Sequence, residues 1–338
     1  MRALPTLILA ALALLCAGLA PALAQDADAT SDIKEVVVGG YINEIHHVEL
    51  RTHSYPGDIY IWFRWDDPED APHETFEFMN LFDPEAHVES VGYDEPEVME
   101  SNGQFYNYIR HQGAFSSAMK MTKYPFDDHV LRFVIEDAEY GTEELRYVPD
   151  PEGVTINSEI SLPGYRIGTP RMIIEDKAYP TTFGDLNNPE TGAYSRVIFE
   201  VPIARPWQYG VFKLFLPVLI VMMCSGLALA IDPTHTEGRI GLAITALLTM
   251  VAMQITTASS LPEVGYLTLL DMAYLLSYAF ILVVMGRVAY CSWNDAPEQV
   301  QRARRNDRKV LGAASAVYIA ALALTSAIWL MRELPDVH

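Results

Sequence analysis

The stretch Glu237–Pro262 reads E-G-R-I-G-L-A-I-T-A-L-L-T-M-V-A-M-Q-I-T-T-A-S-S-L-P. It carries no charged residue between Ile240 and Ser260, so it is long enough to cross a bilayer as a helix. It is also rich in Thr, Ser, Gly and Gln, which is unusual for a surface that faces lipid. At helical spacing one stripe is charged at one end, apolar in the middle and polar at the other end: Glu237, Gly241, Thr245, Leu248, Ala252, Ile255 and Ser259. This pattern predicts a helix that lines a water-filled ion pathway.

The same stripe has a simpler interpretation. Small residues at four-residue spacing, such as Gly241 and Thr245, also allow membrane helices to pack closely. In a symmetric assembly, by contrast, Leu248, Ala252 and Ile255 would form apolar rings that gate a pore by expelling water. The motif Tyr124–Asp127 and Arg205, elsewhere in the same chain, favour the pore.

Three further apolar runs, 211–231, 264–286 and 310–331, are each long enough to span a bilayer. Together with 240–260 they predict an all-α transmembrane domain of four helices over residues 206–338. The linker 287–309 is strongly basic and is therefore expected on the cytoplasmic side; it contains Arg302, Arg304, Arg305, Arg308 and Lys309.

Residues 1–24 have the features of a secretory signal peptide. Arg2 precedes an apolar run, and Ala22-Leu23-Ala24 is a small-x-small cleavage site. We therefore expect the chain from Gln25 onward to be exported. Four spans then return the C-terminus to the same side, which agrees with a cytoplasmic basic linker.

Residues 25–205 alternate short β-rich runs with turn signals, which predicts an all-β, immunoglobulin-like sandwich. The predicted strands are Glu35–Val38, Tyr41–Leu50, Asp58–Trp65, Gln104–His111, Val130–Glu136 and Ala193–Ala204. The run Asp58–Trp65 carries aromatic residues on both faces, so one face is expected in the core and the other against a neighbouring subunit. No cysteine lies between Gln25 and Arg205, which excludes a disulfide or a metal–thiolate site there.

The charge is placed unevenly. The whole chain has a formal net charge of −21, and residues 25–205 contribute 35 acidic and 13 basic side chains, a balance of −22. An acidic, water-facing domain argues against a nucleic-acid partner and favours cations, protons or basic ligands. The alternative is that the charge only keeps the domain soluble.

Three motifs, taken with this layout, resemble the pentameric ligand-gated ion channels (the Cys-loop receptor superfamily), in their bacterial branch. Tyr124-Pro125-Phe126-Asp127 is similar to the family's loop between two strands, with His129 where Gln is usual. Arg205 stands directly before the first helix, as it does in the family. The second helix, from Arg239 to Pro262, is similar to that of the glycine and GABA receptor class.

The chain also departs from that family. Ser117 and Leu131 stand where animal members have the cysteines of the loop disulfide. Anion-selective relatives carry Pro-Ala before the arginine of the second helix, whereas this chain has Glu237-Gly238. A ring of Glu237 carboxylates favours cations, although the same carboxylate is also favourable at any helix N-terminus.

The resemblance implies a coupling layer where the sandwich meets the membrane, with an ion pair from Arg205 to Asp127 or Glu49. Its expected members are Glu49, His53, Pro125, Phe126, Asp127, Arg205 and Pro262. Separately, six aromatic residues could line an agonist pocket at the subunit interface and hold an organic cation, or could serve only as core or interface packing. The candidates are Trp62, Tyr106, Tyr140, Tyr179, Phe183 and Tyr194.

Two other stimuli stay open. Histidines that titrate near neutral pH make proton gating plausible; they include His46, His47, His53, His111, His129 and His235. Two acidic clusters offer oxygen ligands for modulation by Ca²⁺; they comprise Asp66, Asp67, Glu69 and Asp70, and Asp94, Glu95 and Glu97. Solvated charge is the simpler interpretation of these clusters, and no cofactor is expected.

The predicted function is therefore a ligand- or proton-gated, cation-selective homopentameric channel of a bacterial inner membrane, with a periplasmic sandwich in contact with water and spanning helices in contact with lipid. A second hypothesis is a non-conducting, membrane-anchored sensor on the same scaffold. A hydrolase is disfavoured, because neither G-x-S-x-G nor H-E-x-x-H occurs.

Overall fold

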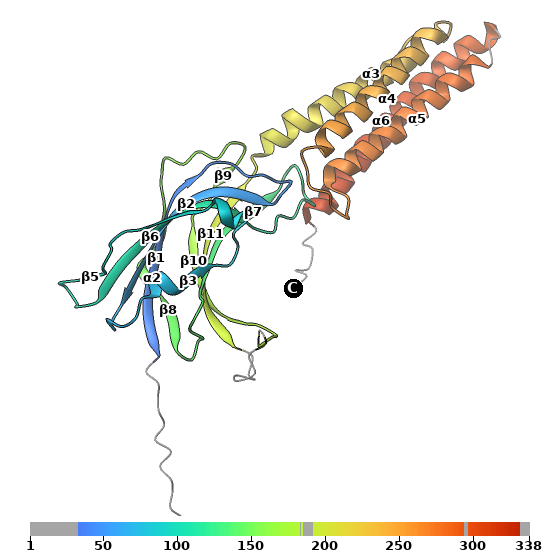
Figure 1. Cartoon of the computed structure of the whole chain (residues 1–338). Coiled ribbons are helices and arrows are strands. Elements are labelled where there is room, and N and C mark those ends of the chain that lie inside the picture. The colour runs from blue at the N-terminus through green and yellow to red at the C-terminus, as the bar shows by residue number, and fades with distance from the viewer. Residues whose placement is uncertain (1–32, 183, 185–191, 294–296, 332–338) are drawn as a thin grey trace, which may run out of the picture.

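The computed structural model describes residues 33–182, 184, 192–293 and 297–331. The chain forms two parts placed end to end, a β-sandwich followed by a bundle of four long helices (Figure 1). This confirms the predicted fold class and its order along the chain. The predicted signal peptide, 1–24, and Phe183 lie outside the described residues.

The first sheet has the strand order β4-β6-β2-β1-β8, with β5 also paired to β6. Its strands are β1 (Lys34–Ile45), β2 (Ser54–Trp65), β4 (Val88–Val91), β5 (Glu97–Val98), β6 (Phe105–Ser116) and β8 (Leu145–Ile156). All pairs are antiparallel except β1 with β8, which is parallel.

The second sheet has the order β10-β11-β7-β3, with β9 paired to β11. Its strands are β3 (Phe76–Phe78), β7 (Asp128–Asp137), β9 (Arg166–Ile167), β10 (Arg171–Ala178) and β11 (Ala193–Ala204). Two single-turn helices, α2 (Pro72–Thr75) and η1 (Pro84–Ala86), connect strands of the two sheets.

Alternation along β2 explains how the sandwich closes. Ile61 and Phe63 are buried in the core, whereas Trp62 and Arg64 lie on the outer face of the sheet. The aromatic residues on the inner face thus fill the core, as predicted, and those on the outer face remain at the surface.

The strand predictions were wrong in three respects. Glu35–Val38 and the start of Tyr41–Leu50, predicted as separate strands, form the single strand β1. This strand ends at Ile45 rather than Leu50, because the chain there turns back into β2 and residues 46–53 form the turn. The strands β8 and β10 were missed. Pro149, Pro151 and Gly153 made β8 look like a loop, yet β8 pairs with β1 on either side of a register shift that accommodates them.

The bundle begins with a π-helical segment, η2 (Tyr209–Phe215), that continues into α3. The regular helices are α3 (Leu216–Ala230), α4 (Thr236–Ala258), α5 (Leu269–Ser292) and α6 (Pro297–Met331). Four segments within the described residues are long and apolar enough to cross a membrane; they are Tyr209–Ala230, Thr236–Ala258, Leu269–Ser292 and Val300–Ile328.

Two helix boundaries differ from those predicted. The third helix begins at Leu269 rather than Val264, because Thr268 caps it and Asp271 completes a reciprocal capping box. The basic linker predicted over 287–309 is helical over residues 287–292 and 297–309, since its Arg, Glu and Gln residues favour a helix as readily as they favour solvent.

Candidate functional site

The polar stripe of α4 lies on the surface of the chain. All seven of its residues are exposed, and Leu248 and Ile255 each have 64% of their surface accessible. The exposed residues are Glu237, Gly241, Thr245, Leu248, Ala252, Ile255 and Ser259.

The opposite face of α4 packs into the bundle. Arg239, Ala243, Ala246 and Met250 are buried there. At 3.6 residues per turn this face is centred roughly 170° from the stripe. The stripe is therefore the side of α4 that points away from its own bundle.

Hydroxyl groups on the stripe bond to their own helix. The Thr245 hydroxyl donates to the Gly241 carbonyl at 2.8 Å, and the Ser259 hydroxyl donates to the Thr256 carbonyl at 2.8 Å. Nothing lies within 4 Å of a Cβ added at Gly238 or Gly241. Both ends of the stripe thus expose small polar groups whose hydroxyls already donate to carbonyls of α4.

A buried ion pair joins the sandwich to the first spanning helix. The Arg205 guanidinium donates from Nε to Asp127 Oδ1 at 2.9 Å and from Nη2 to Oδ2 at 3.3 Å. Both side chains are nearly inaccessible, at 6% and 1% of their surface. Of the two predicted partners, the structure therefore brings Asp127 to Arg205.

His129 binds the same carboxylate. Its Nε2 lies 2.7 Å from Asp127 Oδ2, and it donates the proton because a carboxylate only accepts. Burial acts to raise the pKa of Asp127, but the hydrogen bonds from His129 and Arg205 outweigh it and hold that pKa below its usual value. Asp127 is thus an ionised hub shared by two donors.

Three tyrosines surround the Arg205 guanidinium. Its carbon lies 5.4, 4.5 and 4.9 Å from the ring centroids of Tyr124, Tyr165 and Tyr209. Arg205 also donates to the Tyr165 hydroxyl. Burial raises the pKa of Tyr124 and of Tyr165, so both stay neutral donors and acceptors. The positive charge of Arg205 is therefore stabilised by the faces of aromatic rings as well as by Asp127.

The loop before Asp127 presses on the helices at two places. A Cβ added at Gly210 would lie 2.8 Å from the Phe126 ring and 3.0 Å from Pro125 Cγ, so only glycine fits there. Phe126 also stacks on Phe215, with ring centroids 5.7 Å apart.

The same loop reaches the segment that follows α4. The Met121 N–H donates to the Tyr266 hydroxyl at 2.9 Å, and the Leu269 N–H donates to the Thr122 carbonyl at 3.1 Å. One loop of the sandwich therefore contacts both the entry to α3 and the α4–α5 connection.

The remaining predicted coupling residues lie around this loop or beyond it. His53 has a left-handed backbone with φ 56° and accepts from the Met119 N–H at 3.3 Å. Glu49 lies in the β1–β2 turn and accepts from the Arg51 N–H, so it takes no part in the Arg205 pair. Pro262 is half-buried just after α4.

Four aromatic members of this interface were not among the predicted coupling residues: Tyr124, Tyr165, Tyr209 and Tyr266. Tyr124 and Tyr209 each lie within four residues of Asp127 or Arg205, so their spacing to those motifs was a usable signal. Tyr165 and Tyr266 carry no such signal, since only the fold brings them to the loop.

The predicted agonist residues divide between two places. Trp62 and Tyr106 line a hollow of about 500 Å³ on the outer face of the first sheet, beside Arg64 and Asp150. Asp150 accepts from Trp62 Nε1 at 3.1 Å and from Arg64 Nη2 at 2.5 Å. The hollow thus combines two aromatic faces with one neutralised ion pair.

Tyr140, Tyr179 and Tyr194 lie at the other sheet. The rings of Tyr179 and Tyr194 meet edge to face at 5.9 Å, and Lys34 lies 4.4 Å from the centre of the Tyr140 ring. Within one chain, the two hollows lined by Trp62 and Tyr106 contain none of Tyr140, Tyr179 and Tyr194.

Among the described residues, no group of three His, Cys, Asp or Glu side chains is placed to hold a metal ion. The acidic clusters instead bind other groups of the protein. Asp70 pairs with Lys34 at 2.6 Å, and Asp66 accepts from Gln104 at 3.0 Å.

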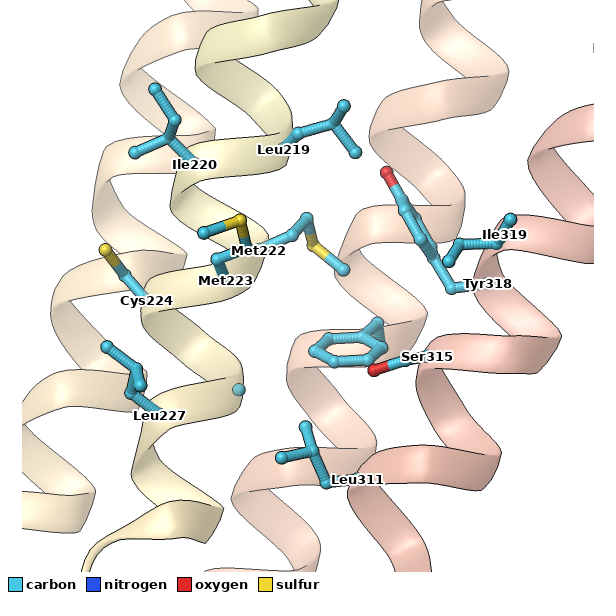
Figure 2. A pocket seen from close by; sticks show the side chains of 12 residues that line it. Leu219, Ile220, Met222, Met223, Cys224, Leu227, Leu311, Ser315, Tyr318 and Ile319 are labelled. Atoms are coloured by element: carbon cyan, nitrogen blue, oxygen red, sulfur yellow. The ribbon is translucent and has the colours of Figure 1, made fainter.

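A second hollow of about 520 Å³ opens between the helices. Figure 2 shows side chains of α3 and α6, among them Met222, Cys224, Ser315 and Tyr318, around an almost wholly apolar space. Its walls belong to spanning segments.

The structure combines a β-sandwich with four helices able to span a membrane, and a buried arginine–carboxylate pair joins the two parts. One of the helices carries an exposed polar stripe. This combination is typical of membrane receptors. Residues 214–316 match the family described as the neurotransmitter-gated ion-channel transmembrane region. This match and the relatives described next support a likeness to the superfamily of pentameric ligand-gated ion channels.

Its curated relatives include three animal receptor subunits. A gamma-aminobutyric acid receptor subunit beta of Lymnaea stagnalis is 25% identical over 64% of this chain and 41% of its own length. A gamma-aminobutyric acid receptor subunit beta-like protein of Drosophila melanogaster is 28% identical over 49% of this chain and 36% of its own. A glutamate-gated chloride channel subunit beta of Haemonchus contortus is 25% identical over 56% and 42%. The chain thus matches about two fifths of the length of these relatives.

Proposed function

We propose that the chain is one subunit of a ligand- or proton-gated ion channel that assembles as a homopentamer around α4. The observation that carries this proposal is the exposure of the whole α4 stripe on the side opposite the bundle. A lipid-facing surface would not be expected to carry Glu237, Thr245 and Ser259. Five copies around an axis would give each stripe a water-filled lumen and make Leu248 and Ile255 apolar rings.

We further propose that the pore prefers cations. Glu237 is exposed at the first turn of α4, whereas the nearby Arg239 is 1% exposed and bonded to Asp307. The ring facing the lumen would then be negative. One relative is named a chloride channel, so the sign of selectivity is the point that measurement must decide.

The agonist site is proposed to form between two copies, with the hollow of Trp62 and Tyr106 on one and Tyr179 and Tyr194 on the next. Its support is that each group is incomplete within one chain and lies on a different sheet. Aromatic walls of this kind suit an organic cation. Protons are the alternative stimulus, since His129 binds the interface carboxylate directly.

The sandwich is proposed to face the periplasm and the helices to lie in a bacterial inner membrane. The support is the signal-like N-terminus and the basic α5–α6 region, which suits a cytoplasmic position. Lipid acyl chains would then cover the apolar hollow of Figure 2.

Recording from the purified protein in planar bilayers, with pH and candidate amines varied, tests this function. Leu248→Thr is expected to wet the apolar ring and lower the half-activating concentration by at least about tenfold. Leu275→Thr is the matched control, since Leu275 is an exposed leucine of α5. No current under any condition would refute the channel and favour a membrane-anchored sensor.

A further inference from the structure

A single buried carboxylate ties together the helices at the end of the bundle far from the sandwich. Asp307 of α6 is 1% exposed. Its Oδ2 accepts from Arg239 Nη2 of α4 at 2.7 Å, and its Oδ1 accepts from Arg287 Nε of α5 at 2.7 Å. The α3–α4 and α5–α6 connections meet at the same end (Figure 1).

Arg239 is held inside the bundle by more than this ion pair. Its Nε donates to the Ala228 carbonyl at the end of α3, at 2.7 Å. Both ends of the guanidinium are therefore used, and the side chain is 1% exposed. On α4 it points about 200° away from Glu237, which is two residues earlier.

The cluster of Arg239, Arg287 and Asp307 has more positive than negative charge. Two arginines share one aspartate, so the cluster carries one net positive charge beside the α4 terminus. The Cys291 thiol also lies 3.6 Å from Asp307 Oδ1. On α6 the neighbouring charges are the exposed Arg304, Arg305 and Arg308, and Arg304 lies 3.8 Å from Asp232. His235 and Glu237 are exposed at the start of α4. Removing the Asp307 charge would leave two unpaired guanidinium groups behind the proposed ring of Glu237.

We propose that Asp307 is a specificity-determining positioning residue, which holds Arg239 away from the lumen and offsets its charge so that Glu237 sets the sign of the selected ion. This inference rests on the proposed channel function. It assigns to the fourth helix, which does not line the proposed pore, a role in ion selection.

The test is the cation-to-chloride permeability ratio from reversal potentials under a salt gradient. Asp307→Asn is expected to lower that ratio on the order of tenfold, because one uncompensated charge about 10 Å from the lumen, across the width of α4, acts at an intermediate dielectric constant. Asp307→Glu keeps the charge and is expected to stay within about twofold of the wild type. Asp307→Asn with Arg239→Gln removes both charges and is expected to restore the ratio.

A merely structural role predicts a different result. Asp271→Asn is the matched control, since Asp271 is a carboxylate at the opposite end of the bundle, where it caps α5. It should lower thermal stability without moving the permeability ratio. If Asp307→Asn changes stability in the same way and leaves the ratio unchanged, the inference is overturned.

A second measurement needs no current and therefore separates the two hypotheses. Gly241→Cys, in a Cys224→Ser/Cys291→Ser background, places a thiol on the open stripe. The Cys291 thiol lies 3.6 Å from Asp307 Oδ1, and serine keeps a donor there, so every variant is compared within this same background. The rates of the introduced thiol with a cationic and an anionic thiol reagent report the local potential. Asp307→Asn is expected to shift the ratio of these rates towards the anionic reagent on the order of tenfold.

If the wild type conducts no current and the rate ratio nevertheless shifts in Asp307→Asn, the channel proposal fails while the electrostatic role of Asp307 stands. An unchanged rate ratio overturns that role. Where Asp307→Asn yields no folded protein, Arg239→Gln alone supplies the test. It is expected to shift the rate ratio towards the cationic reagent, and no shift would again overturn the inference.

Discussion

Asp127→Asn is the sharpest test of the interface between sandwich and helices. It keeps the shape of the side chain and removes the charge that faces Arg205 and His129. Because Asp127 is 1% exposed and Arg205 is 6% exposed, water cannot replace the lost partner. Breaking a buried ion pair by removing one charge typically costs about 3–5 kcal/mol of unfolding free energy. The faces of the tyrosine rings around Arg205 stabilise its charge in part. The expected loss of unfolding free energy therefore lies near the lower figure, roughly 3 kcal/mol.

The assay is thermal unfolding of the purified protein in detergent, followed by tyrosine and tryptophan fluorescence. For a domain of this size 1 kcal/mol corresponds to roughly 2–4 °C, so the midpoint should fall by about 6–12 °C. Asp128→Asn is the matched control, because Asp128 is the exposed neighbour of Asp127, and its effect should stay within about 0.5 kcal/mol.

The pH dependence follows from the lowered pKa of Asp127. A carboxyl with a lowered pKa in the folded state contributes stability above its unfolded value, near 4, and loses it only as pH falls through the folded value. The difference between Asp127→Asn and the wild type should therefore be constant from pH 5 to 8. Equal midpoints for Asp127→Asn and Asp128→Asn would refute the reasoning.

Three further predictions concern other contacts. Gly210→Ala should cost about 1–3 kcal/mol, because its Cβ would meet Phe126 at 2.8 Å, whereas Gly286→Ala meets open space and should not destabilise; equal thermal midpoints would contradict this. Burial and His111 lower the pKa of His87, so its contribution to stability is present above the unfolded value near 6.5 and falls as pH drops below it; a His87→Leu variant should show a smaller loss between pH 7.5 and 5 in the same thermal assay. Tyr266→Phe removes the hydroxyl that accepts from Met121 at 2.9 Å and should cost about 1 kcal/mol, while hydrogen exchange of the Met121 amide should quicken; unchanged exchange would exclude the contact.

Much of the architecture was predictable because its signals are local. The four spans follow from long uncharged runs, and the strands β2, β6, β7 and β11 follow from β-rich composition and alternation. The strand β8 was not predictable in this way. Its prolines and glycine oppose a strand locally, and only pairing with β1 across a register shift makes it one.

The candidate site shows the same division. The α4 stripe is a property of one helix, so its spacing predicted which residues would share a face. The hub around Asp127 joins β7, the end of β11 and the segment near Tyr165, which are distant in sequence. Sequence resemblance supplied Arg205, Asp127 and, in the same motif, Tyr124, but not Tyr165 and Tyr209, which also surround the charge.

The sequence by itself determined the two-part layout, the four spans and the polar stripe from Glu237 to Ser259, because hydrophobic length and helical period are encoded residue by residue. Only the tertiary structure decided that Arg205 pairs with Asp127 rather than Glu49, that the aromatic residues divide between two sheets, and that Arg239 turns inward onto Asp307. The physical reason is that a buried charge takes whichever partner the packing brings within hydrogen-bond distance, and that choice depends on segments far apart in the chain.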